Sequence, residues 1–266
     1  ITGFKSNLSI NKKNFFKINI NNFDDISKIF KKYKFDYVFH FAALVGVQRT
    51  QKKPLQVLKD ITGFENIFSL SSKYKIKRIF FSSSSEVYGE PVTIPQNEET
   101  TPLNSRIPYA IVKNLGESFC KTYLKEKKLS YTIFRFFNTY GKKQSADFVI
   151  SKFIKQAKFN KPIKIYGDGK QKRTFCYIDD TIEVILNCLK NNLYKNDIIN
   201  IGSDKEVSMN ELAKIIIKKT KSKSKIIHIK PLKEGDMRRR KPDITKMKNI
   251  IKRDLVKLSI GLSNII

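Results

Sequence analysis

The sequence predicts an α/β fold in which helices cover both faces of a doubly wound parallel sheet. Amphipathic segments, with apolar residues three or four positions apart, alternate along the chain with short and almost wholly apolar segments. Such apolar segments are typical of strands that are buried on both faces of a parallel sheet. Their alternation with helices indicates repeated β-α units. No internal repeat and no long Gly, Ser or Pro linker interrupts the pattern.

The expected elements follow one another closely. In the first predicted helix, residues 24–33, Ile26, Ile29 and Phe30 share one face. Ser208, with Glu211 three residues later, predicts a capping box at the start of a later helix. The other expected elements are strands over 36–43, 78–85, 131–138, 164–167 and 198–202, and helices over 54–74 (opened by Pro54), 108–127, 148–158 and 180–190. Because open parallel sheets bind ligands beyond the carboxyl ends of their strands, the loops after Ala43, Ser84 and Phe137 should meet at one site.

Composition sets wide limits on function. The 266 residues carry a net charge of +29, and 44 of the 53 basic residues are Lys. The lysines are spread along the chain, which favours a solvated basic surface over a local site for nucleic acid. Such a charge still attracts anionic ligands over long distances.

Cysteine usage and hydropathy indicate a cytoplasmic protein. Cys120, Cys176 and Cys188 lack paired or metal-type spacing and are expected to be free thiols in a reducing compartment. No apolar run is long enough to span a bilayer. His40 lies in a predicted buried strand, and His228 has no acidic or cysteine partner nearby in sequence, so no metal site is predicted.

The clearest chemical signal is Tyr109 followed four residues later by Lys113, which places both on one helix face. An ammonium beside a phenol lowers the phenol pKa, and a phenolate can act as a base toward a hydroxyl proton. The same spacing also occurs in ordinary amphipathic helices. Here Ser84 ends a strand 25 residues earlier and a second strand end follows, and this context favours a catalytic site.

Seven segments together carry a family resemblance. They are DYVFHFAALVGV, SSSSEVYG, YAIVK, RFFNTYG, IYGDGKQKRTFCYIDD, INIG and EGDMRRRKPDI. In this order the chain resembles extended short-chain dehydrogenases/reductases of the NAD-dependent epimerase/dehydratase family. The resemblance implies a Rossmann-like NAD-binding domain over 1–145, to which 174–202 return. It also implies a smaller C-terminal α/β domain, mostly 146–266, that binds a nucleotide sugar.

The resemblance also implies roles for individual residues. Tyr109 would take the proton of the sugar 4-hydroxyl, Lys113 would hold the nicotinamide ribose and tune Tyr109, and Ser84 would bond to the same sugar oxygen. Phe41, Ala42 and Ala43 would line the cofactor together with Tyr109 and Lys113, Asn138 would contact the substrate diphosphate, and Arg173 would contact its nucleotide part.

Three positions favour one activity within the family. Ser85, Glu86 and Arg240 resemble the residues that surround the uronate carboxylate in UDP-glucuronate decarboxylases. Oxidation at C4 gives a β-keto acid, which loses CO₂ readily because the ketone accepts the electrons. The leading hypothesis is therefore a UDP-glucuronate decarboxylase that makes UDP-xylose. A surface carboxylate at Glu86 and a solvated basic loop around Arg240 are the simpler alternatives.

The family's glycine-rich turn for the dinucleotide has no counterpart in the sequence. We therefore expect that about 30 residues, the first βαβ segment, precede Ile1 in the parent protein. The loss of that segment should expose apolar parts of the sheet.

Other functions stay open at this stage. A UDP-glucose or UDP-glucuronate 4-epimerase would use the same Tyr109 and Lys113. An inactive remnant that binds polyanions without turnover is an alternative of another class. Homodimerisation through helices 54–74 and 108–127 is common in the family, and Leu55, Leu58, Phe119 and Leu124 are candidate interface residues.

Overall fold

The computed structural model describes residues 15–231 and 237–266, so the first three residues of the EGDMRRRKPDI segment lie outside the described residues. Its centre is a parallel sheet in the order β1-β2-β3-β8. The strands are β1 (Tyr37–His40), β2 (Arg78–Ser84), β3 (Tyr131–Phe136) and β8 (Asp197–Ile201). Ser84 pairs with Phe136, and Phe136 pairs with Ile201. The carboxyl ends of β2, β3 and β8 therefore lie side by side.

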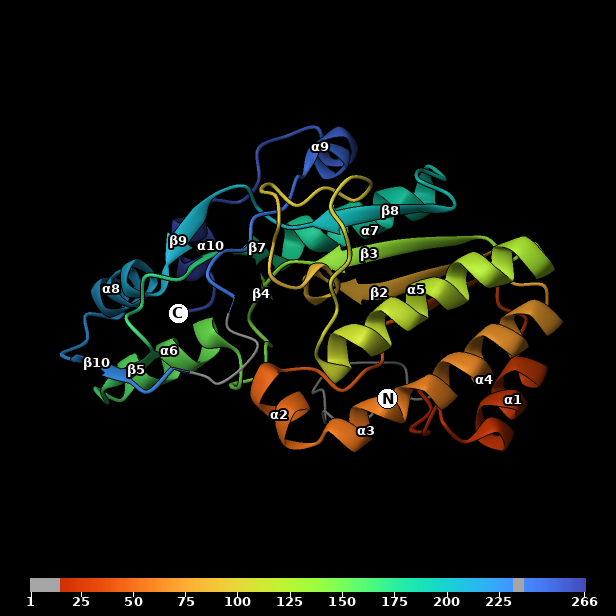
Figure 1. Ribbon diagram of the computed structural model, residues 1–266, viewed down its shortest axis with the longest axis horizontal. Helices are drawn as coiled ribbons and strands as arrows, with labels where there is room; N and C mark the ends of the chain where they lie inside the picture. The colour runs from red at the N-terminus through yellow and green to blue at the C-terminus, as the bar shows by residue number, and fades with distance from the viewer. Residues whose placement is uncertain (1–14, 232–236) are drawn as a thin grey trace.

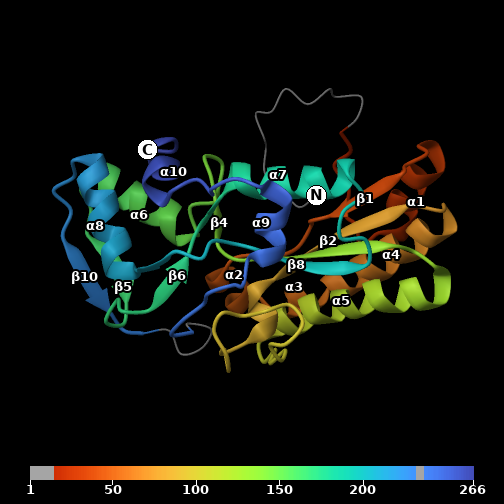
Figure 2. The same cartoon turned by 90° about the horizontal axis from the view of Figure 1, so that it is seen from above.

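Helices cover both faces of this sheet (Figure 2). One face carries α1 (Phe23–Lys32), α3 (Pro54–Leu58), α4 (Asp60–Lys73) and α5 (Pro108–Lys127). The other face carries α7 (Ile178–Lys190) and α9 (Thr245–Ile251). Each face has its own apolar core, with Phe81 on the side of α5 and Phe80 on the side of α7. The predicted doubly wound α/β class is confirmed.

A second group of elements lies beside the sheet in the other half of the molecule (Figure 1). It contains α6 (Val149–Lys158), α8 (Met209–Thr220) and α10 (Leu258–Ser263), with a core of their apolar faces. Three strand pairs complete it: β4 (Thr139–Tyr140) with β7 (Cys176–Tyr177), β5 (Ile163–Tyr166) with β10 (Ile226–Ile229), and β6 (Lys172–Thr174) with β9 (Glu206–Ser208). The capping box of Ser208 and Glu211 begins α8, as predicted. The domain division at residues 145 and 146 stays a prediction.

Two local expectations need correction. The predicted helix over 54–74 is interrupted at Lys59, whose backbone N–H bonds to the Val57 carbonyl oxygen, so α3 and α4 are separate. A further helix, α2 (Val47–Lys52), precedes them; it follows Gly46, whose φ of 101° suits glycine.

The strand that contains β1 was expected to be buried on both faces, and only one face is. Tyr37, Phe39 and Phe41 are each about 40% exposed on the side of α7. The reason is that β1 is an edge of the described sheet and no described helix covers this part of it.

The opposite face of β1 buries His40. Its ring is 3% exposed and packs against Phe64 and Phe81, with centroid distances of 5.3 and 5.8 Å. Burial lowers the pKa of His40 from 6.5 to about 3, and the nearby charge of Lys113 acts in the same direction. His40 is thus a neutral core residue, as its position in the sequence suggests.

A buried ion pair joins α5 to β3. The Arg135 guanidinium donates to both carboxylate oxygens of Glu117, with Nε–Oε1 and Nη2–Oε2 distances of 2.9 and 2.7 Å. Ser83 Oγ donates to the same carboxylate at 2.5 Å, and Arg135 Nη1 donates to the Tyr88 hydroxyl at 2.8 Å. Arg135 and Glu117 are both almost fully buried. The Glu117–Arg135 pair thus connects α5, β2 and β3, and it also holds the Tyr88 hydroxyl.

Replacement of Arg135 by Ala is expected to reduce the free energy of unfolding by about 3–5 kcal/mol, because Glu117 is left buried and unpaired. Urea unfolding followed by circular dichroism measures this loss. Lys77→Ala, which removes one partner of the exposed Lys77–Asp36 pair, is the control and should leave the unfolding midpoint unchanged within error. A loss below about 1 kcal/mol for Arg135→Ala would contradict the central role given to the pair.

The low pKa of His40 predicts a specific acid sensitivity. Below pH 6.5 the unfolded chain binds a proton at His40 that the folded chain does not bind until about pH 3, so stability falls as the pH decreases through this range. Between pH 6.5 and 4.5 the wild type should lose about 2 kcal/mol more than His40→Leu. Comparison of the two unfolding curves cancels the carboxylates that both proteins share. Parallel losses in the two proteins would show that His40 titrates normally.

Candidate active site

A cleft of about 610 Å³ opens at the carboxyl ends of the central strands and extends toward α6 and β5. The loops that follow β1, β2 and β3 all contribute to its wall, as the sequence predicts. Eight of the predicted site residues line it: Phe41, Ser84, Ser85, Glu86, Tyr109, Asn138, Arg173 and Arg240. Lys113, Ala42 and Ala43 are not among the lining residues.

The turn after β2 places two of these residues. Ser84 ends the strand, and its Oγ accepts a hydrogen bond from the Glu86 N–H at 3.2 Å. The 3₁₀ turn Ser85–Tyr88 follows and buries Ser85 and Glu86. Gly89 then has a φ of 63°, and a Cβ at this position would lie 2.1 Å from the Asn104 carbonyl oxygen. The glycine is therefore required for the sharp turn that directs Glu86 into the cleft.

Helix α5 places Tyr109 and Lys113 beside this turn. Lys113 is 1% exposed, and its Nζ donates to the Ser82 carbonyl oxygen at 2.6 Å. The same Nζ lies 5.9 Å from the centroid of the Tyr109 ring. Tyr109 in turn shares a hydrogen bond with Ser84. The structure thus brings together the three residues that the sequence analysis selected.

The predicted ionisation of Tyr109 is wrong for the ligand-free protein. Burial raises the pKa of Tyr109 well above its ordinary value and outweighs the hydrogen bond from Ser84. The carboxylates of Glu86 and Asp60 also raise this pKa, whereas the charge of Arg240 lowers it. Because the Lys113 amine is directed at the Ser82 carbonyl, its presence one helical turn away does not keep the phenol ionised.

Asp60 is a site residue that sequence reasoning missed. Its Oδ2 accepts a hydrogen bond from the Leu44 N–H at 3.1 Å, which holds the loop after β1. Burial lowers the pKa of Lys113 to about 8, and the negative charge of Asp60 opposes that shift. An acidic residue at the start of a helix is common for electrostatic reasons alone, so its position in the sequence gave no signal.

Glu86 and Arg240 form an ion pair in the wall of the cleft. The distance from Arg240 Nη2 to Glu86 Oε1 is 2.8 Å, and both side chains are more than nine-tenths buried. Arg240 Nε also contacts the Met237 sulfur at 3.1 Å. Glu86 Oε2 is buried and has no hydrogen-bond partner among the described residues. An open acceptor in a buried site is able to receive a donor from a ligand.

Asn138 and Arg173 also line the cleft. Asn138 follows β3, and Arg173 lies in β6. Asn138 Nδ2 donates to the Thr174 carbonyl oxygen at 3.0 Å, and Arg173 Nη1 donates to the Lys172 carbonyl oxygen at 2.8 Å. Both are thus fixed by the chain around β6. Further lining residues that the sequence analysis did not select are Gln144, Lys152, Lys164, Tyr166 and Gln171.

The residues that the sequence analysis assigns to the nicotinamide ribose half of NAD are only partly at the cleft surface, because Phe41 lines the cleft whereas Lys113 is buried and does not line it. The Lys113 ammonium can donate three hydrogen bonds, and the described residues give it one acceptor, the Ser82 carbonyl oxygen. Phe41 is about 40% exposed and gives the cleft an aromatic wall. The adenosine and pyrophosphate half is different, because no glycine-rich turn is present in the sequence for these groups.

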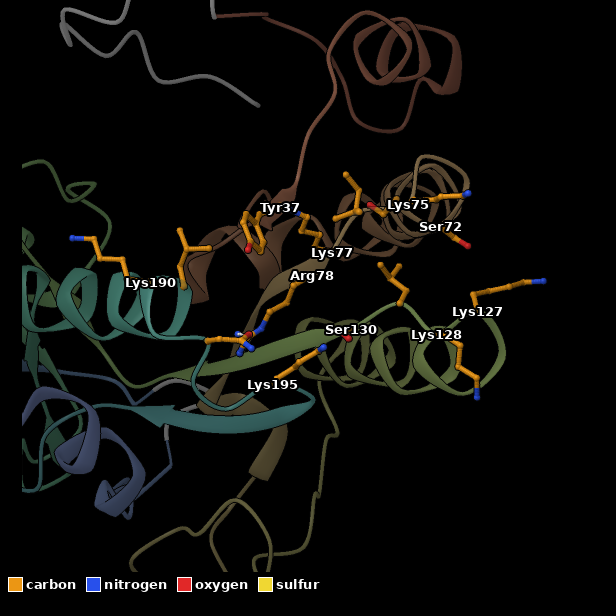
Figure 3. A pocket seen from close by; sticks show the side chains of 15 residues that line it. Tyr37, Ser72, Lys75, Lys77, Arg78, Lys127, Lys128, Ser130, Lys190 and Lys195 are labelled. Atoms are coloured by element: carbon orange, nitrogen blue, oxygen red, sulfur yellow. Dashed lines mark hydrogen bonds between the residues drawn. The ribbon is translucent and has the colours of Figure 1, made fainter.

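A second cavity, of about 690 Å³, lies at the other end of the strands, where β1 and β2 begin (Figure 3). Seven basic residues line it: Lys75, Lys77, Arg78, Lys127, Lys128, Lys190 and Lys195. Helices α4, α5 and α7 all end at its rim, where cations stabilise the negative ends of the helix dipoles. Arg78 donates to the Cys188 and Leu193 carbonyl oxygens at the end of α7. Lys127 and Lys190 extend in opposite directions, so they do not converge on one ligand (Figure 3).

No group of three or more His, Cys, Asp or Glu among the described residues could hold a metal ion. Nor does any helix in the described ranges combine the length and apolar character needed to cross a membrane. All three cysteines are buried and form no disulfide.

Comparisons with known proteins agree with this geometry. A sequence profile described as NAD dependent epimerase/dehydratase family matches residues 2–202. A UDP-N-acetyl-α-D-glucosaminuronate decarboxylase of Bacillus cytotoxicus is 38% identical over 229 residues, which are 81% of this chain and 70% of that protein.

Two crystal structures are also similar. A UDP-glucose 4-epimerase of Thermotoga maritima with UDP-glucose has a TM-score of 0.89 and 29% identity, and the match covers 94% of this chain and 82% of that one. A UDP-glucuronic acid 4-epimerase of Bacillus cereus in complex with UDP-glucuronic acid and NAD has a TM-score of 0.84 and 29% identity, covering 94% and 79%. The chain therefore belongs to the NAD dependent epimerase/dehydratase family, a family of NAD-dependent enzymes that includes UDP-sugar epimerases and decarboxylases.

Proposed function

We propose that this protein decarboxylates UDP-glucuronate to UDP-xylose. The observation that carries the proposal is the buried Glu86–Arg240 pair in the wall of the cleft, beside Tyr109. A guanidinium suits a carboxylate because it donates two parallel hydrogen bonds. The similarity to a uronate decarboxylase supports the same substrate class.

The chain's own residues account for orientation and proton transfer. NAD, when bound, would accept a hydride from sugar C4 and later return it. Once its own proton has passed to solvent, Tyr109 receives the proton of the 4-hydroxyl and returns it to that oxygen when the ketone is reduced. Ser84 bonds to the same oxygen. Arg240 holds the C5 carboxylate until the C5–carboxylate bond breaks, CO₂ leaves, and the electron pair moves toward the C4 ketone. The C5 carbon then takes a proton that comes from solvent, and Glu86 can pass it on because its Oε2 has no hydrogen-bond partner among the described residues and it lies on the same wall as Arg240.

Tyr109 has to lose its proton before it can act as the base. Burial and two nearby carboxylates oppose the phenolate, so new positive charge or the loss of negative charge near the ring is needed. Lys113, with a pKa of about 8, keeps its charge at neutral pH and is the cation one helical turn from Tyr109.

A 4-epimerase is the second candidate. The observation in its favour is that Glu86 already neutralises Arg240, so this cation is not free to receive a substrate carboxylate without rearrangement. An enzyme for neutral hexoses would use Tyr109 and Lys113 in the same way and would need no arginine for a carboxylate. An inactive protein that binds polyanions is the third hypothesis, for which the basic cavity where β1 and β2 begin is the candidate surface.

The reaction product distinguishes the hypotheses. The protein, supplied with NAD⁺ and UDP-glucuronate, is expected to release CO₂ and form UDP-xylose, which NMR of the anomeric protons identifies. Formation of UDP-galacturonate alone would show that the decarboxylase proposal is wrong. The absence of NAD binding together with salt-sensitive RNA binding would support the polyanion hypothesis instead.

Variants connect that product to the residues, as part of the same test. Glu86→Gln and Arg240→Ala should each lower kcat for CO₂ release by about 10²-fold or more, since each removes a group that contacts the carboxylate or moves a proton. Tyr109→Phe should abolish turnover and retain UDP binding. Unchanged CO₂ release in Arg240→Ala would show that the substrate carboxylate does not bind to Arg240 in this cleft.

We also propose a homodimer through α3 and α5. Leu55, Leu58 and Ile111 are 75%, 42% and 47% exposed on these two packed helices. Phe119 and Leu124, the other apolar residues selected from the sequence, pack against the core instead.

Sedimentation analysis should therefore give about twice the mass of the 30.9 kDa chain. Leu55→Glu should shift the protein toward the monomer, because it places a charge in the apolar interface. Phe159→Glu, at an exposed position after α6, is the matched control and should leave the mass unchanged. A wild-type monomer at micromolar concentration would refute the dimer.

A further inference from the structure

Asn200 is a fully buried amide in β8, at the edge of the sheet where the cleft opens. Its side-chain amide nitrogen, its side-chain oxygen and its backbone N–H all have hydrogen-bond partners. Its side-chain Nδ2 donates to the Gln96 carbonyl oxygen at 2.9 Å and to the Asp243 carbonyl oxygen at 3.2 Å. Its Oδ1 accepts from the Tyr88 hydroxyl at 2.9 Å, and its backbone N–H donates to Glu98 Oε1 at 2.7 Å. Asn200 therefore joins three segments that are far apart in the sequence.

The bond from Tyr88 connects Asn200 to the turn that carries Glu86. Tyr88 ends the 3₁₀ turn Ser85–Tyr88, two residues after Glu86, and its ring is 1% exposed. Its hydroxyl also accepts from Arg135 Nη1 at 2.8 Å, so the turn is held from β3 and from β8 at once. A shift of Tyr88 would move Glu86, because only Val87 lies between them.

The bond to Asp243 connects the same amide to the segment that carries Arg240. The Gln96 N–H donates to the Lys241 carbonyl oxygen, and the Asp243 N–H donates to the Gln96 carbonyl oxygen, both at 2.8 Å. Asn200 Nδ2 donates to one carbonyl oxygen on each side of this short pairing, that of Gln96 and that of Asp243. Pro242 packs so close to Gly202 that a Cβ there would lie 2.7 Å from the proline Cγ. Residues 241–243 are thus seated against the end of β8, and Arg240 enters the cleft directly before them.

We propose that Asn200 is a positioning residue that holds both partners of the Glu86–Arg240 pair at their places in the cleft, and so determines how well the site accepts a sugar carboxylate. The inference rests on the proposed function, since it concerns the same pair. Asn200 does not line the cleft and is not a catalytic residue. Its effect on substrates passes through Tyr88 on one side and Asp243 on the other.

The alternative is that Asn200 only stabilises the fold. The two roles differ in what they change, because a loss of stability alone affects all ligands that bind the folded protein equally. A positioning role affects ligands that reach Arg240 and leaves others unaffected. UDP carries no sugar carboxylate, which makes it a suitable reference ligand.

The experiment compares Asn200→Ser with Arg240→Ala and with the double variant. Asn200→Ser should raise KM for UDP-glucuronate about tenfold or lower kcat by a similar factor, while the Kd of UDP stays within about twofold of the wild type. In the double variant the loss should not exceed that of Arg240→Ala by more than about twofold, because both substitutions act on one interaction. Asn191→Ser, at an exposed position after α7, is the control and should change none of these values.

Tyr88→Phe tests the same link with a smaller change. It removes only the hydroxyl that joins the Glu86 turn to Asn200, and it retains the ring, so it keeps the test valid if Asn200→Ser fails to fold. It should also weaken UDP-glucuronate turnover more than UDP binding. Equal losses for UDP and UDP-glucuronate, or effects of Asn200→Ser and Arg240→Ala that multiply, would overturn the inference. If Arg240→Ala leaves UDP-glucuronate turnover intact, the proposed function itself is wrong. If Arg240→Ala lowers turnover but Asn200→Ser does not, only the positioning role is wrong.

Discussion

The site depends on how α5 is fixed against the sheet. Tyr109, Lys113 and Glu117 follow one another at four-residue intervals on one face of this helix, and each contacts the end of β2. Glu117 accepts hydrogen bonds from Arg135 and Ser83, and Lys113 donates to the Ser82 carbonyl oxygen. Translation of α5 along the sheet would therefore break several buried hydrogen bonds at once. Desolvation makes a buried ion pair costly in free energy. The contribution of the Glu117–Arg135 pair is that it restricts α5 to one position on the sheet.

Burial then determines the chemistry of the site. It raises the pKa of Tyr109 and lowers those of Lys113 and His40, so it disfavours the charged form of each group. The positive charge of Lys113 survives at neutral pH because Asp60 partly compensates for desolvation. For the Tyr109 phenol, the hydrogen bond with Ser84 and the charge of Arg240 act against burial but do not outweigh it. The same burial that fixes the side chains in space thus keeps the phenol protonated.

Sequence patterns predicted the elements and the Ser84, Tyr109 and Lys113 group, because periodicity and strand ends are local properties. The prediction of an ionised Tyr109 failed since spacing shows proximity but not the direction of the Lys113 amine or the depth of burial. Asp60, Glu117 and Asn200 were missed because each acts through partners distant in sequence, such as Arg135 for Glu117 and Tyr88 for Asn200. The exposed face of β1 could not be read from its apolar pattern, which reports the residues of the strand and not the elements that cover it.

The large positive charge and the specificity of the cleft are separate properties. Where β1 and β2 begin, basic side chains lie at helix ends and point in different directions, as a solvated surface with dipole compensation requires. In the cleft, Arg240 is buried, paired with Glu86, and fixed through residues 241–243. The spread charge draws anions toward the protein without distinguishing among them. Discrimination needs a cation whose position is determined by its neighbours, and a buried amide in β8 provides that constraint with no charge of its own.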